Sequence, residues 1–116
     1  MINERIALVM LNGEVPGRAG DPHHTKQYYH TIQDFAYASA LLCEKGQFKK
    51  LEEFLWVAWK LFKEGNETVK SGIVNVFLFT LSRAMDQHPN AKKNIEPFMP
   101  GELRLEYARM LYAPAV

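Results

Sequence analysis

Histidine and aspartate side chains in the first third of the chain have the types, and part of the spacing, that a metal site needs. His30 and Asp34 are four residues apart, which places them on one face of a helix. Structural zinc takes four protein ligands and catalytic zinc three, and the remaining candidate, His24, lies six residues before His30, so a helix turns it to another side. A small metalloprotein using these three residues is an alternative, but a surface hydrogen bond between His30 and Asp34 is favoured, and we predict no metal site.

Other reactive groups have equally plain interpretations. Cys43 is the only cysteine, so the chain cannot form an internal disulfide, and its predicted position near a core face is typical of a thiol that acts as a small hydrophobe. The segment GEVPGRAG, residues 13–20, lacks the spacing and the Gly-Lys-Ser/Thr ending of a phosphate-binding loop. The sequence therefore predicts a protein that is not an enzyme and that carries no cofactor.

The charge balance also narrows the choice of partners. Lysine and arginine number 14 against 13 acidic residues, a formal net charge of +1, which gives no support for general nucleic-acid binding. The uninterrupted apolar run near the N-terminus covers only residues 7–11, too short for a membrane span. We expect a cytoplasmic protein with neither a nucleic acid nor a membrane as partner.

Apolar residues recur at helical spacing along most of the chain. In a predicted first helix, Ile2, Ile6 and Val9 recur at helical spacing together with Ala7, Met10 and Leu11. It is predicted to end at Gly13, and a loop of glycine and proline residues follows over about 13–22. A second helix is predicted to start at Asp21 and Pro22 and to end in a turn at Gly46. The other predicted helices cover about 48–64, 67–88 and 100–112, with a single helical turn in 91–98. This pattern indicates one domain over residues 1–116, a compact all-α bundle of four to five helices with a tail at 113–116.

The run IVNVFLFTL, residues 73–81, has two interpretations. Its β-branched and aromatic residues would suit a buried strand, whereas the Asn66 cap and the length of the segment favour a helix. As a helix it is apolar on nearly every side, so we expect it to be the central and most buried one. Small residues, among them Gly72 and Asn75, would let neighbouring backbones approach it closely.

Trp56 does not fit the apolar arc of its helix. It falls on the polar side, which also carries Glu53 and Lys60, where a large indole adds little to the stability of a monomer. Tryptophan at such positions is typical of interface anchors, so we predict partner binding by these three residues. The alternative is that the last helix or the long loop covers the indole.

Tyr37 and Leu41 are two further large apolar residues that lie outside the apolar stripe of their helix. They point away from the main stripe of their helix, toward the side that carries His30 and Asp34. Either this helix is packed on both sides, or Tyr37, Asp34 and His30 form a mixed patch that binds a partner. An aromatic patch with acidic neighbours would suit a protein with a positively charged surface.

Two stretches carry a family resemblance. LFKEGNETVKSGIVNVFLFTLS, from Leu61 to Ser82, joins an acidic helix end, a Gly-Asn cap and an apolar helix, and FMPGELRLEYARM spans Phe98 to Met110. Together they resemble a small all-helical bacterial immunity-protein family associated with polymorphic and contact-dependent growth inhibition toxins. The matching positions are helix caps and core residues, so no binding residue is transferred.

The resemblance implies a cytoplasmic antidote that binds one cognate toxin domain, commonly a nuclease, and blocks it by stoichiometric occlusion. Such a protein needs a rigid scaffold and a distinctive surface rather than a catalytic group. The alternative is a helical protein–protein interaction or adaptor domain, homodimeric and without any connection to a toxin.

Overall fold

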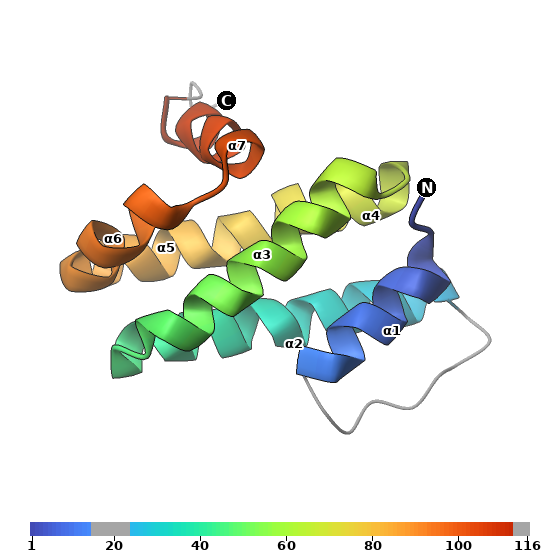
Figure 1. Ribbon diagram of the computed structural model, residues 1–116, viewed down its shortest axis with the longest axis horizontal. Coiled ribbons are helices and arrows are strands. Elements are labelled where there is room, and N and C mark those ends of the chain that lie inside the picture. The colour runs from blue at the N-terminus through green and yellow to red at the C-terminus, as the bar shows by residue number, and fades with distance from the viewer. Residues whose placement is uncertain (15–23, 113–116) are drawn as a thin grey trace.

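The computed structural model describes residues 1–14 and 24–112, and these form helices throughout except for short connections and one isolated β-bridge (Figure 1). This confirms the predicted all-α bundle. The elements are α1 (Glu4–Glu14), α2 (His24–Lys45), α3 (Phe48–Glu64), α4 (Glu67–Gly72), the π-helical segment η1 (Ile73–Leu78), α5 (Phe79–Gln87), α6 (Pro89–Ile95), the 3-10 turn η2 (Glu96–Phe98) and α7 (Gly101–Tyr112). Because α4, η1 and α5 run on as one rod, the described chain has six helices rather than four or five.

The helices are arranged around the pairing of α2 with the α4–η1–α5 rod. In Figure 1, α3 runs diagonally in front of α2 and α5, and it contacts α2, α4 and η1. Helix α1 packs mainly on α2, α6 folds against α5 and α3, and α7 lies on α3. None of the described helices is both long and apolar enough to cross a bilayer.

Three buried phenylalanines connect α2, α3 and η1. The ring of Phe35 from α2 stacks on Phe54 from α3, with centroids 4.6 Å apart and planes 6° from parallel. Phe77 from η1 lies 5.2 Å from the same Phe35 ring. All three rings are buried, so these contacts fix the side of α2 that faces α3 and the side of η1 that faces α2.

The N-terminus differs from the sequence prediction. Ile2 is extended rather than helical, because its N–H donates to the Glu64 carbonyl at 2.7 Å and its carbonyl accepts from the Asn66 N–H at 2.8 Å. Helix α1 then starts with the Asn3 side chain accepting from the Ile6 N–H. That start turns Leu8 to the core together with Ala7 and Leu11 of the predicted apolar set, and it leaves two other members of that set, Ile6 and Val9, exposed.

The first predicted loop lies only partly within the described residues. Helix α1 continues through Gly13 to Glu14, so the predicted end at Gly13 is wrong. The remainder of the loop, the predicted helix start at Asp21 and Pro22, and the tail at 113–116 lie outside the described residues. The second turn agrees with the prediction, since Gly46 has a φ of 72° between α2 and α3.

Asn66 caps the rod as predicted, its side-chain oxygen accepting from the Val69 N–H at 3.0 Å, and residues 73–81 are helical rather than strand. The sequence did not reveal that Ile73–Leu78 widens into a π-helix. At its start the Val69 carbonyl accepts both the Ile73 N–H and the hydroxyl of buried Tyr28, at 2.6 Å. Nor is this helix buried on all sides, because Asn75, Phe79 and Arg83 are exposed.

Gly72 of the rod lies in tight contact with Tyr28 of α2, a close approach that its small size predicted. A Cβ added to Gly72 would lie 2.6 Å from the Tyr28 ring and 2.7 Å from its hydroxyl oxygen. We expect Gly72→Ala to lower the free energy of unfolding by about 1–3 kcal/mol through overpacking, measured by urea denaturation. In an open helix alanine would instead be favoured by about 1 kcal/mol, so a net loss identifies the contact.

Gly101 provides the matched control, because a Cβ built there meets nothing within 4 Å. Gly101→Ala should change the free energy of unfolding by less than about 0.5 kcal/mol. Equal stability of the two variants would show that Tyr28 and Gly72 are not in tight contact.

Candidate functional site

The six residues predicted to bind a partner lie on two separate parts of the surface. Trp56, Glu53 and Lys60 are on α3, whereas His30, Asp34 and Tyr37 are on α2. Helix α3 packs on the side of α2 that carries Phe35, and Tyr37, two residues further along, points to the opposite side. The structure therefore does not combine the two predicted groups into one site.

The α3 surface shows how Trp56 is placed. Its ring meets Trp59 edge to face, with centroids 5.2 Å apart, and Trp56 is 58% exposed. The last helix covers Trp59 rather than Trp56, because the Trp59 indole N–H donates to a Glu102 carboxylate oxygen of α7. That hydrogen bond is the main cause that lowers the pKa of Glu102. The last helix thus leaves Trp56 on the surface.

The neighbours of Trp56 are mostly lysines. Four exposed lysines lie along α3, and Glu53 forms an ion pair with one of them, Lys50, at 3.1 Å. A second, Lys63, places its ammonium 4.9 Å from the centroid of the Trp59 ring, while Lys60 is exposed. Protein interfaces are depleted in lysine, so this surface offers one anchor in an unfavourable setting.

The second group leads to a better-formed site between α2 and the rod. Tyr37 is 62% exposed and Phe79 is 50% exposed. Tyr37 comes two residues after Phe35, which stacks on Phe54 of α3, and Phe79 comes two residues after Phe77, which packs on Phe35. Together they line an open groove of about 440 Å³, here named the aromatic groove. The rest of its lining includes Gln33, Asn75, Arg83 and Gln87.

Of the predicted α2 residues, Tyr37 lines the groove and His30 and Asp34 lie beside it on the same helix. His30 is exposed, Asp34 is half-buried, and Leu41 is 47% exposed one turn beyond Tyr37. Leu41 and Tyr37 therefore form a mixed patch rather than a second packing face. Within residues 1–14 and 24–112 no three histidine, cysteine, aspartate or glutamate residues are grouped as metal ligands; the His24 side chain is not described.

Two residues of the groove were missed from the sequence. Phe79 was assigned to the buried core and Arg83 was given no role, yet the guanidinium carbon of Arg83 lies 5.7 Å from the centroid of the Phe79 ring. The available signal was their spacing of four residues, which pairs side chains on one side of a helix. It indicated a pair but not that this side faces solvent.

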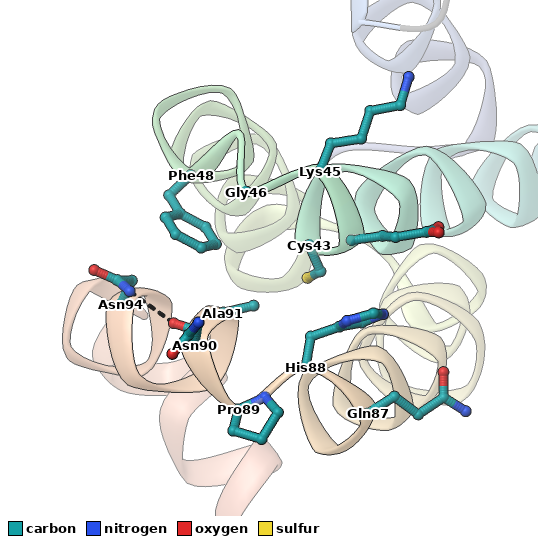
Figure 2. A pocket seen from close by; sticks show the side chains of 11 residues that line it. Cys43, Lys45, Gly46, Phe48, Gln87, His88, Pro89, Asn90, Ala91 and Asn94 are labelled. Carbon is teal, nitrogen blue, oxygen red and sulfur yellow. Dashed lines mark hydrogen bonds between the residues drawn. The ribbon is translucent and has the colours of Figure 1, made fainter.

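A different cavity, also of about 440 Å³, lies between the α2–α3 turn and the α5–α6 junction. Figure 2 shows Cys43 of α2 and His88 of that junction on its walls, with the Asn94 side chain bonded to the Asn90 carbonyl. Cys43 is only 3% exposed, and burial raises the pKa of its thiol to about 11. No hydrogen bond joins Cys43 to His88 in the part of the chain described, so the thiol is a protonated core group, as predicted.

Comparison with known proteins places the chain in a family. The model of a family described as a domain of unknown function (DUF7674) matches residues 11–113, so the chain belongs to this family. No curated protein and no solved structure matches it significantly.

The Cys43 environment can be measured by alkylation. A pKa raised from 9.0 to about 11 leaves about one-hundredth as much thiolate at neutral pH, so iodoacetamide should label native protein on the order of a hundred times more slowly than denatured protein. The raised pKa also contributes stability that is complete below pH 9 and is lost as the pH rises toward 11.

His88→Ala is the control for this experiment, because it removes the nearest imidazole from the cavity wall and leaves the burial of Cys43 in place. The labelling rate should not change. Equal rates in native and denatured protein, or slower labelling in His88→Ala, would reveal a thiol activated by the imidazole and contradict the assignment of Cys43 to the core.

Proposed function

We propose that this member of the DUF7674 family is a protein-binding domain that neutralises a cognate toxin domain by covering it. The aromatic groove carries the proposal, because Tyr37 and Phe79 both line it and expose large rings where they add little to the core. Tyrosine, phenylalanine and arginine are enriched in protein interfaces, and all three line this groove.

The helices that form the groove are held together by contacts that exist before a partner binds. Its two walls are joined from behind by the buried rings of Phe35, Phe54 and Phe77, and the Tyr28 hydroxyl ties α2 to the rod at Val69. A preorganised surface loses less conformational entropy on association than a flexible one. This rigidity favours tight, stoichiometric inhibition by contact alone.

The connection to a toxin rests on the resemblance in Leu61–Ser82 and Phe98–Met110 to immunity proteins of contact-dependent growth inhibition. Asn75, Phe79 and Thr80, which line the aromatic groove, lie inside the first of these stretches. The proposed partner is a toxin domain, commonly a nuclease, met in the cytoplasm where such a toxin would act. Occlusion of its active site or of its substrate-docking surface requires no catalytic group and no cofactor from this chain.

The second candidate is a helical adaptor domain that dimerises without any toxin. It is favoured by Trp56, which is 58% exposed and packed edge to face on Trp59. A homodimer across α3 would bury two such indoles. Sedimentation at micromolar concentration distinguishes the two candidates, because Trp56→Ala would dissociate that dimer whereas a monomeric wild type would exclude it.

Co-expression with the toxin domain encoded beside this gene tests the first candidate. We expect the wild-type chain to restore growth and to bind the purified toxin one to one. Tyr37→Ala combined with Phe79→Ala should abolish protection and raise Kd by at least about thirtyfold, since anchor residues contribute about 2 kcal/mol or more. Both rings are half exposed or more, so the melting temperature should change little.

The matched control is Trp56→Ala combined with Glu53→Lys, on the α3 surface. It should leave protection close to wild type. Loss of protection in this pair with full protection in the groove variant would move the binding surface to α3. A wild-type chain that neither binds nor protects would contradict toxin neutralisation.

A further inference from the structure

Arg83 is the one charged residue among those that line the aromatic groove within the described chain. The rest of that lining is aromatic, aliphatic, amide or hydroxyl in character. One cation in an otherwise neutral groove gives the site a single point of charge recognition. A ligand that matches it carries one negative group with apolar or uncharged surroundings.

The surroundings of Arg83 leave its hydrogen-bond donors available. Its guanidinium carbon is 5.7 Å from the Phe79 centroid, an arrangement in which the ring supports the cation without using its N–H groups. Among residues 1–14 and 24–112, no carboxylate forms a salt bridge with Arg83. The guanidinium can therefore donate two parallel N–H hydrogen bonds to a planar group with two oxygens, such as a carboxylate.

The amides of the groove add a second kind of contact. Gln33 comes from α2, Asn75 from η1 and Gln87 from the end of α5, so amide groups line both walls. Each amide offers a donor and an acceptor, which are the groups that pair with a polypeptide backbone. Tyr37 and Phe79 supply apolar surface between them.

We propose that the aromatic groove binds a protein segment that presents an aspartate or glutamate carboxylate to Arg83 and an adjacent apolar side chain to Tyr37 and Phe79. This deepens and rests on the proposed function, because it states the chemistry by which the toxin domain would be recognised. It replaces the expectation of a positively charged partner, which was based on the acidic neighbours of Tyr37 and not on Arg83.

Single-stranded nucleic acid could also use aromatic rings beside an arginine, but the charges disfavour it. A phosphodiester chain requires several cations along its path, and this groove has one. Glu44 is exposed two helical turns beyond Tyr37 on the same side of α2. A run of phosphates that extended along α2 from the groove would meet this acid.

Selection from a phage-displayed library of random linear peptides on the whole chain tests the inference. We expect enriched peptides to share an acidic residue next to an aromatic or aliphatic one. For the synthesised peptides, Arg83→Gln should weaken Kd by at least about tenfold, and so should exchange of the acidic residue for its amide. Arg109→Gln, at an exposed arginine of α7, should leave Kd unchanged.

Three results would overturn the inference: enriched peptides without an acidic residue, unchanged affinity in Arg83→Gln, or Arg83-dependent binding of a single-stranded oligonucleotide in place of peptides. The toxin assay separates this inference from the proposed function. Full protection by Arg83→Gln would overturn the inference and leave toxin neutralisation standing. Arg83-dependent binding of acidic peptides by a chain that gives no protection would support the inference and overturn the toxin role.

Discussion

The stack of Phe35 on Phe54, with Phe77 beside it, is the contact on which the rest of the arrangement depends. Three helices meet at these rings, and each ring fixes the rotation of its helix about the helix axis. Once Phe35 points toward Phe54 and Phe77 points toward Phe35, side chains two positions later must point away from these contacts. Tyr37 and Phe79 occupy those positions, so the same packing that forms the core also forms the aromatic groove.

The π-helical segment adjusts the rod to this contact. A π turn accommodates one additional residue, which rotates the helix that follows by about 100° relative to an uninterrupted α-helix. Val69, Ile73 and Phe77 before the junction and Leu81 and Met85 after it are all buried. The Tyr28 hydroxyl satisfies the carbonyl of Val69 where the hydrogen-bond pattern begins to change. The close contact at Gly72 and this hydrogen bond both place Tyr28 against the start of the π-helical segment.

The two exposed aromatic surfaces differ in what surrounds them. Trp56 lies among lysines, and its neighbour Trp59 serves the fold by bonding to Glu102 and receiving α7. Tyr37 and Phe79 lie beside amides and one arginine, in a groove between α2 and the α4–η1–α5 rod. Burial of a lysine ammonium at an interface is costly. Burial of these amides costs little when the partner supplies hydrogen bonds to them. That difference is why the groove, and not the tryptophan, is the better candidate for a partner.

Local features of the chain were enough to predict the helices and most of their ends. Asn66, Gly46 and the spacing of apolar residues act within a few positions of themselves, and the predicted bundle, the turn at Gly46 and the cap at Asn66 all agree with the structure. Contacts between segments that are distant in the sequence determined the features that the sequence did not predict. The bridge from Ile2 to Gly65 set the inner side of α1, Tyr28 packed against Gly72, and Phe79 and Tyr37 came to line the same groove. Helical periodicity defines a face, but which neighbour covers that face depends on how the helices pack, and this packing exposed the groove.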